Sequence, residues 1–217
     1  MVRDSFALNA CVMSEQAMQE VQNLRLVVVG AGGLGGFVAQ GLVRLGAQNI
    51  AVIDGDAFSD SNLNRQFFCN STTLGKPKAE VCVAEMLQVA PEGKYKAIKA
   101  FITEKNVSYL HGFDFVFDCA DNVKTKLLLE SYCVSKGIIL IHAGVNGNFG
   151  QTAIIDGKPI LSSLFRRETK SRNSVILPQI TAGLQLNLFV QYLNKTYQKN
   201  RLYLIDLQTM QISDIKY

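Results

Sequence analysis

The chain has 217 residues, of which 48% are hydrophobic and 18% charged, and its formal net charge is +4. This composition is typical of one globular α/β domain that can bury a full core. No apolar run is long enough to span a membrane, and the polar, mixed first 23 residues do not resemble a signal peptide. Basic residues are scattered except for one cluster that we interpret as a solvated loop, which argues against nucleic acid as a partner; the cluster comprises Arg166, Arg167, Lys170 and Arg172.

The cysteines indicate a reducing compartment. There are five of them, an odd number, and no two are spaced as a C-x-x-C pair. Such a set predicts reduced thiols and a cytoplasmic protein, and it argues against a cysteine-built zinc site.

The first strong pattern in chain order is a strand, a glycine-rich turn and a helix. Leu26–Val29 is a continuous aliphatic run typical of a strand buried on both faces. Gly30, Gly32 and Gly35 satisfy G-x-G-x-x-G, with Gly33 between them, so the backbone can approach phosphate closely at a helix N-terminus. A second strand, Asn49–Ile53, follows and ends at an acid, Asp54, which is placed to reach ribose hydroxyls.

A polar segment rich in Asn and Arg comes directly after this second strand. It contains Asp56, Ser61, Asn62, Arg65 and Gln66. Asn62 and Arg65 can donate hydrogen bonds to phosphate oxygens, and Arg65 can bind two at once. Lys78, at the start of the next helix, adds a point charge, so the segment predicts that phosphates are reacted and not only bound.

The alternation of strands and helices continues along the chain. We predict helices over 78–88, 106–110, 124–135 and 180–197, and strands over 95–101, 113–119, 137–142, 151–156, 159–164, 202–206 and 211–216. Residues 144–150 read as a glycine- and asparagine-rich turn, and 166–173 as an irregular polar stretch. The predicted fold class is α/β, a Rossmann-like doubly wound and mostly parallel sheet with antiparallel C-terminal strands. We expect an N-terminal segment, 1–23, and a single ATP-binding domain, 24–217.

The polar residues after several strands should meet at one edge of this sheet, beyond the strand carboxyl ends. Asp121 is placed there to hold Mg²⁺ with nucleotide phosphates, although it and Asn122 could equally cap the following helix. His142 reads as a hydrogen-bonded core histidine. Hydride transfer leaves pyrophosphate intact and needs no such cationic clamp, whereas nucleotidyl transfer does.

Five ordered motifs resemble the ThiF/MoeB/HesA family, to which the adenylation domains of ubiquitin-activating enzymes belong. They are Gly30–Gly35, Asp54-x-Asp56, Ser61–Gln66, Gly75–Lys78 and Asp118–Asn122. The resemblance implies an ATP-dependent adenylyltransferase that uses MgATP to adenylate the C-terminal glycine carboxylate of a small ubiquitin-like sulfur carrier ending in Gly-Gly. Thiamine or molybdopterin biosynthesis is the usual setting, and a homodimer is expected. Transferred to this chain, the resemblance implies catalytic roles for Arg65, Lys78 and Asp121, with Asp121 as the Mg²⁺ ligand. It implies ATP binding by Gly30, Gly32, Gly33, Gly35, Asp54, Asp56, Ser61, Asn62, Arg65, Gln66, Lys78 and Asn122.

The chain departs from the family pattern in three places. It lacks the two C-x-x-C pairs that hold zinc in many members, and no cysteine follows Cys133 to form a thioester. Arg3 is the one counterpart of the family's N-terminal arginine, which reaches the ATP of a partner subunit. We therefore predict adenylation without zinc or covalent transfer. The alternatives are a relative that acts on a modified tRNA base or a small molecule, a non-catalytic nucleotide-binding partner, and a dinucleotide oxidoreductase.

Overall fold

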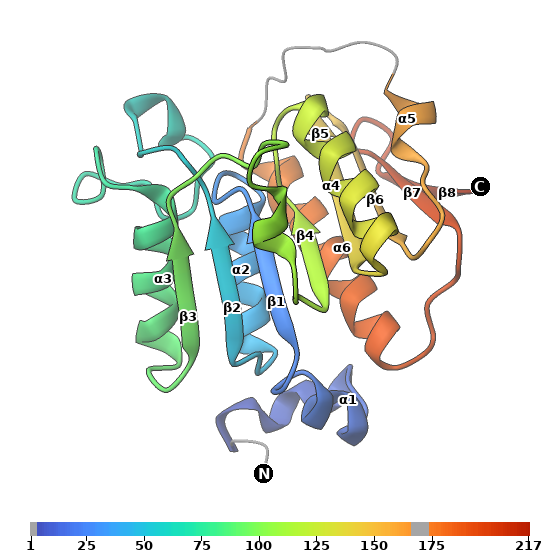
Figure 1. Ribbon diagram of the computed structural model, residues 1–217, viewed down its shortest axis with the longest axis horizontal. Coiled ribbons are helices and arrows are strands. Elements are labelled where there is room, and N and C mark those ends of the chain that lie inside the picture. The colour runs from blue at the N-terminus through green and yellow to red at the C-terminus, as the bar shows by residue number, and fades with distance from the viewer. Residues whose placement is uncertain (1–3, 166–173) are drawn as a thin grey trace.

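The computed structural model describes residues 4–165 and 174–217. Its centre is an eight-stranded sheet with the strand order β3-β2-β1-β4-β5-β6-β7-β8 (Figure 1). The first five strands in that order are parallel, and the last three are added antiparallel. The strand bounds are β1 Arg25–Val29, β2 Asn49–Ile53, β3 Lys94–Ile98, β4 Phe115–Asp118, β5 Ile139–Asn146, β6 Phe149–Ile155, β7 Arg201–Asp206 and β8 Gln211–Lys216. The predicted fold class is confirmed.

Helices cover both faces of this sheet, as the doubly wound prediction requires. Helices α2, α3 and α6 pack on one face, and α4, α5 and the short helix η3 lie on the other (Figure 1). The α-helices are α1 Glu15–Glu20, α2 Gly35–Arg44, α3 Lys78–Val89, α4 Val123–Lys136, α5 Leu161–Leu164 and α6 Ile176–Leu193. The 3₁₀ helices are η1 Asp4–Cys11, η2 Asp60–Asn62 and η3 Val107–Leu110.

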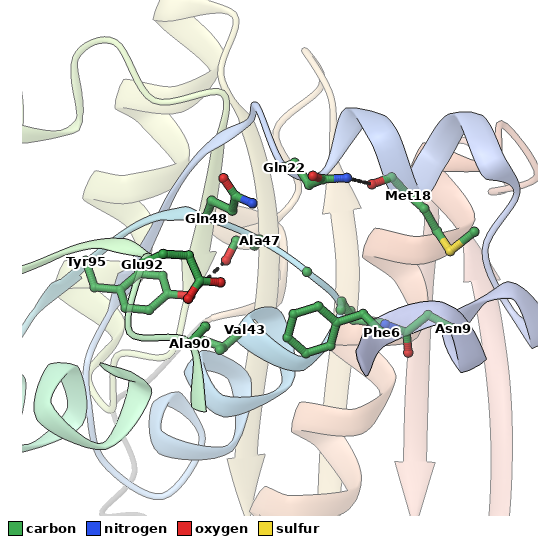
Figure 2. A pocket seen from close by; sticks show the side chains of 12 residues that line it. Phe6, Asn9, Met18, Gln22, Val43, Ala47, Gln48, Ala90, Glu92 and Tyr95 are labelled. Carbon is green, nitrogen blue, oxygen red and sulfur yellow. Dashed lines mark hydrogen bonds between the residues drawn. The ribbon is translucent and has the colours of Figure 1, made fainter. Parts of the chain in front are cut away.

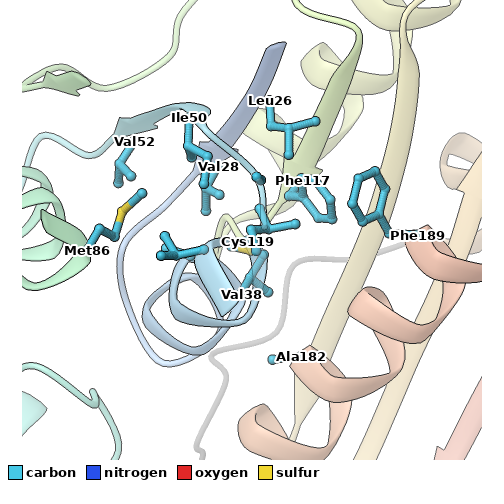
Figure 3. Packing of buried hydrophobic residues seen from close by; sticks show 14 of the residues in the cluster. Leu26, Val28, Val38, Ile50, Val52, Met86, Phe117, Cys119, Ala182 and Phe189 are labelled. Carbon is cyan, nitrogen blue, oxygen red and sulfur yellow. The ribbon is translucent and has the colours of Figure 1, made fainter. Parts of the chain in front are cut away.

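The central strands are buried on both faces because each alternates its side chains between two apolar clusters. In β1, Leu26 and Val28 join the cluster under α2, α3 and α6, while Val27 and Val29 join the cluster under α4. Figure 3 shows the first cluster, in which Phe117 of β4 packs edge-to-face on Phe189 of α6 with ring centroids 5.3 Å apart. This two-sided burial explains why these strands read as unbroken aliphatic runs.

The chain reverses its winding direction between β1 and β4, and this reversal places the functional site. After β1 the chain adds β2 and β3 on one side, and it then returns to place β4 on the other side of β1. The carboxyl ends of β1 and β4 therefore diverge into loops that leave a crevice between them, which is where open α/β sheets bind ligands.

Two predicted elements are wrong in detail. Residues 159–164 do not form a strand, because Leu161–Leu164 is a short helix whose N-terminal amides are capped by the buried Glu130 carboxylate. Its Oε1 accepts from the N–H of Ile160 at 2.6 Å and of Leu161 at 2.8 Å. The predicted turn at 144–150 is shorter, because β5 and β6 continue pairing up to Asn146 and Phe149.

The N-terminal helices lie under the opposite edge of the sheet from the crevice. Met13, Ala17 and Val21 of this segment are buried in the first apolar cluster. A small pocket remains between them and the sheet, and Phe6 and Tyr95 are among the residues that line it (Figure 2). Its volume of about 20 Å³ leaves room for roughly one water molecule, so it does not compete with the crevice as a ligand site.

Candidate functional site

The glycine turn between β1 and α2 is built by backbone contacts that exclude side chains. Gly30 has φ +96°, and a Cβ there would lie 2.6 Å from the carbonyl oxygen of Cys119. A Cβ on Gly35 would lie 1.7 Å from the carbonyl oxygen of Gly30. Leu34 precedes the helix as its N-cap, and its side chain makes no capping hydrogen bond, although the Gly36 N–H donates to the carbonyl oxygen of Gly32 at 3.2 Å. The N-terminus of α2 is therefore not occupied by a capping side chain and faces the crevice as a site suited to an anion.

Asp54 ties this turn to the end of β2. One carboxylate oxygen accepts from the N–H of Ala31 at 2.6 Å, and the other accepts from the N–H of Asp56 at 2.8 Å. Burial raises the pKa of Asp54, and these two backbone hydrogen bonds oppose the rise. Asp54 therefore both holds the turn and lines the crevice.

The cationic residues of the predicted clamp have defined local partners. The Lys78 side chain is buried, and its Nζ lies 3.2 Å from Oδ2 of Asp56. Nη1 of Arg65 donates to the carbonyl oxygen of Ser61 and to Oδ1 of Asn64, both at 2.7 Å. Arg65 lines the crevice with part of its donor set engaged, so we expect its guanidinium to reorient when phosphate enters.

Asn62 has a structural task. Its Oδ1 accepts from the N–H of Ser59 at 3.1 Å, and the Ser59 side chain accepts from the Asn62 backbone, which together form a capping box around η2. Asn62 is buried, and among the described residues that we predicted for the site, Gly35, Ser61 and Asn62 do not line the crevice. Their role in phosphate binding stays a prediction.

Asp121 is free of the capping role that we considered for it. Asn122 is the N-cap of α4, and its Oδ1 accepts from the N–H of Thr125 at 2.9 Å. The exposed Asp121 carboxylate instead lines the crevice, with Asn122 Nδ2 3.4 Å from its Oδ1. Because the described residues hold no cluster of three or more His, Cys, Asp or Glu, a metal here would need ligands from phosphate as well. One carboxylate plus phosphates is a donor set that fits Mg²⁺.

The crevice has a volume of about 650 Å³, large enough for a nucleotide and part of a second substrate. It brings together most of the predicted site residues, namely Gly30, Gly32, Gly33, Asp54, Asp56, Arg65, Gln66, Lys78, Asp121 and Asn122. The Oε1 of Gln66 is buried and has no hydrogen-bond partner among the described residues. This oxygen can therefore accept a hydrogen bond from a ligand in the crevice.

Some lining residues carry no motif that could have revealed them, among them Phe101, Pro178 and Val145. Phe101 follows β3, and its ring lies over Gly55 although 61% of its surface is exposed. Pro178 of α6 lies 3.5 Å from the position of a Cβ on Gly33. Val145 comes from β5. A weak signal existed only for Phe101, an aromatic residue at the carboxyl end of a strand.

A buried ionic network supports the wall formed by β4 and α4. Lys126 Nζ lies 3.1 and 3.2 Å from the two carboxylate oxygens of Asp118 and donates to the carbonyl oxygen of Ala143. His142 Nδ1 lies 2.6 Å from Asp118 Oδ2, and its Nε2 faces the Gln151 amide at 3.0 Å. Burial raises the pKa of Asp118, but the Lys126 charge and the His142 hydrogen bond outweigh it and leave that pKa below its usual value. The interpretation of His142 as a hydrogen-bonded core residue agrees with these contacts.

The comparisons with known proteins agree with this geometry. The ThiF family model matches residues 6–217. The chain belongs to the ThiF family. Several relatives are tRNA threonylcarbamoyladenosine dehydratases, and that of Haemophilus influenzae is 38% identical over 138 residues, covering 63% of this chain and 52% of the relative. The SAMP-activating enzyme E1 of Haloferax volcanii is 36% identical over 143 residues, covering 65% of this chain and 53% of that protein.

A comparison with solved structures shows the same fold. The crystal structure of Escherichia coli MccB with ATP superposes with a TM-score of 0.79 at 21% identity, over 93% of this chain and 66% of that one. The chain spans about half the length of the curated relatives it matches. None of the described helices is long and apolar enough to cross a membrane. Arg3 and the basic cluster at 166–172 lie outside the described residues.

Proposed function

We propose that this protein uses ATP and Mg²⁺ to adenylate a carboxylate, and that the carboxylate belongs to threonylcarbamoyladenosine in tRNA. The observation that carries the first part is the crevice, where Arg65, Lys78 and Asp121 surround a glycine turn at a helix N-terminus. The second part rests on the relatives named for that tRNA nucleoside. It departs from our sequence-based expectation, which favoured a sulfur carrier and argued against nucleic acid.

The reaction is written as an in-line displacement on ATP. An oxygen of the acceptor carboxylate attacks the α-phosphorus. The bond between the α-phosphorus and the oxygen that bridges to the β-phosphorus breaks, and pyrophosphate leaves with that electron pair. The products are an acyl adenylate and pyrophosphate. When a nucleophile within the acceptor then attacks the activated carbonyl carbon, AMP leaves, and the net change in the acceptor is the loss of water. ATP supplies the driving force for this dehydration.

Different residues of the crevice would bind different parts of MgATP. The α2 amides with Gly30, Gly32 and Gly33 would hold phosphate oxygens, and Asp54 would bind the ribose. Arg65 and Lys78 would neutralise the charge that develops on the α-phosphate and on the leaving pyrophosphate. Asp121 would hold Mg²⁺ together with the phosphates, and the bound ion would supply further charge neutralisation.

No step in this scheme needs a cysteine nucleophile, in agreement with the environment of the thiols. Burial raises the pKa of Cys82 and of Cys133 to about 12, and it also raises that of Cys119. These thiols are therefore protonated near neutral pH. Cys11 is exposed, but it belongs to η1 beneath the opposite edge of the sheet.

The test is ATP–pyrophosphate exchange with tRNA that carries threonylcarbamoyladenosine. We expect exchange that depends on the tRNA and falls about 10²- to 10³-fold in Lys78→Met and in Asp121→Asn. Lys76→Met is the matched control, because Lys76 is two residues away, exposed and outside the crevice lining. Exchange that is absent with this tRNA, or equally reduced by Lys76→Met, contradicts the proposal. ATP binding without any exchange would indicate a non-catalytic nucleotide-binding protein.

The second candidate acceptor is the C-terminal carboxylate of a small ubiquitin-like protein ending in Gly-Gly. The relative that favours it is the SAMP-activating enzyme E1. A parallel exchange assay with such a carrier distinguishes the two, because only the true acceptor stimulates exchange. The homodimer implied by the family is a further proposal, which sedimentation velocity would test.

A further inference from the structure

The edge strand β3 and the loop after it carry a row of lysines that leads toward the crevice. We define the lysine row as Lys94, Lys96, Lys99 and Lys105. All four are exposed, and none forms an ion pair with another described residue. One acid, Glu104, lies within this stretch, and it pairs with Lys124 at 3.9 Å. The row is thus a surface of net positive charge without an internal partner.

The register of β3 shows which side of the sheet the row occupies. Lys94 and Lys96 pair with Asn49 and Ala51 of β2, whereas Tyr95 points to the opposite face and packs into the cluster under α3. Helix α3 therefore covers one face of β3 and leaves the lysine face open, as Figure 1 shows at the sheet edge.

The row continues into the crevice through the end of the strand. β3 is parallel to β1 and β2, so its carboxyl end points to the same edge as the glycine turn. Lys99 follows that end, and Phe101 then lines the crevice with its ring largely exposed. The Lys124–Glu104 contact brings the loop beside the start of α4, where Asp121 lies.

We propose that the lysine row binds the phosphate backbone of an RNA acceptor and directs it into the crevice, where Phe101 stacks on an unpaired base. This inference rests on the proposed function, because it assigns a docking surface to the same site. Residues two apart on a strand recur about every 6.6 Å, so Lys94 and Lys96 can contact successive parts of one backbone, and Lys99 and Lys105 extend the positive charge beyond the strand end. Phosphate contacts position an RNA, and stacking on an aromatic ring is the usual way to hold a splayed base.

RNA fits this surface better than an acidic protein does. Both partners would satisfy the lysines, but a largely exposed phenylalanine at the mouth of a nucleotide crevice is suited to a base with a π-face. The basic residues look scattered in the sequence, but β3 places Lys94 and Lys96 on one face, and the end of the strand carries Lys99 toward the crevice.

The test measures binding of tRNA by fluorescence anisotropy over a series of salt concentrations. In Lys96→Ala/Lys99→Ala we expect the slope of log affinity against log salt to shrink by about 1.4 to 1.8, since each lost contact releases about 0.7–0.9 fewer ions. At 0.1 M salt the same relation gives a roughly 40-fold weaker affinity. Lys199→Ala/Lys216→Ala is the control. It also removes two positive charges, but from exposed positions near β7 and β8, at the edge of the sheet opposite β3. Phe101→Leu should weaken binding about tenfold without changing the slope.

Each outcome bears on one of the two proposals. Wild-type protein that binds no tRNA, or equal slopes in the two double variants, overturns the docking surface and leaves adenylation standing if a carrier still supports exchange. Loss of carrier binding in Lys96→Ala/Lys99→Ala would instead assign this face to a protein partner and overturn the RNA proposal. tRNA binding that needs the lysine row, without exchange on any acceptor, would support the surface and contradict adenylation.

Discussion

Replacement of Asp118 by asparagine should destabilise the fold strongly, because it leaves the buried Lys126 ammonium without a counter-charge. The Asp118 side chain is fully buried, and Lys126 Nζ lies within 3.2 Å of both its oxygens. Breaking a buried ion pair from one side costs about 3–5 kcal/mol. At about 2–4 °C per kcal/mol for a domain of this size, the midpoint of thermal unfolding should fall by roughly 6–20 °C.

The same helix offers a matched control. Lys124 lies two residues before Lys126 and pairs with Glu104 at 3.9 Å, but the two side chains are 80% and 77% exposed. Glu104→Gln should therefore cost less than about 1 kcal/mol. In the double variant Asp118→Asn/Lys126→Met the loss should be smaller than the sum of the single losses, since the unpaired charge is removed as well.

Urea denaturation followed by circular dichroism measures wild type, the single variants Asp118→Asn, Lys126→Met and Glu104→Gln, and the double variant under one condition. The reasoning about the buried pair is wrong if the free energy of unfolding of Asp118→Asn is within about 1 kcal/mol of that of wild type. It is also wrong if the loss in the double variant equals the sum of the losses in the two single variants. Equal losses in Asp118→Asn and Glu104→Gln would show that burial of the pair does not decide its contribution.

Three further predictions concern the turn, the pH dependence and the thiols. Gly35→Ala should abolish ATP binding and destabilise the fold, because its Cβ would collide with the Gly30 carbonyl. The control Gly183→Ala in α6 meets no atom within 4 Å and should be neutral or stabilising. Isothermal titration measures ATP binding, and urea midpoints measure stability, for both variants. Burial lowers the pKa of His142, so the folded state resists protonation of this side chain. The free energy of unfolding should therefore be highest above the unfolded pKa of about 6.5 and should fall at lower pH. The urea midpoint of wild type should drop between pH 7.5 and pH 5.5, and His142→Gln should make that drop smaller. A thiol-reactive dye should label Cys11 rapidly in native protein and the remaining, buried cysteines only after unfolding; rapid labelling of a second thiol would contradict the burial described above.

Local patterns predicted the elements that depend on local physics. The aliphatic run Leu26–Val29 and the glycines after it specify a buried strand and a phosphate turn, since the turn has no room for a Cβ. The order of strand, turn, helix and acid along the chain predicted that Asp54 and the neighbouring site residues lie at one edge of the sheet. The motifs also predicted the family, which the match over residues 6–217 confirms.

Partners far apart in sequence decided the rest. Residues 159–164 read as a strand by composition, but Glu130 in α4 caps their amides and a short helix forms instead. Lys126 carries no signal in the sequence, because only the parallel pairing of β4 and β5 brings Asp118, His142 and the Ala143 carbonyl around it.

The sequence by itself determined the α/β fold class, the glycine turn and ten of the residues that line the crevice, because spacing and backbone sterics are local properties. The structure decided that Asn122, and not Asp121, caps α4, and tertiary structure alone decided which lysines share a face. Lys94 and Lys96 share a face because they alternate with Tyr95 along β3, and that face is open because β3 is an edge strand that α3 covers on its other face. Which elements pack against an edge strand depends on segments far apart in the sequence, and no local pattern encodes it.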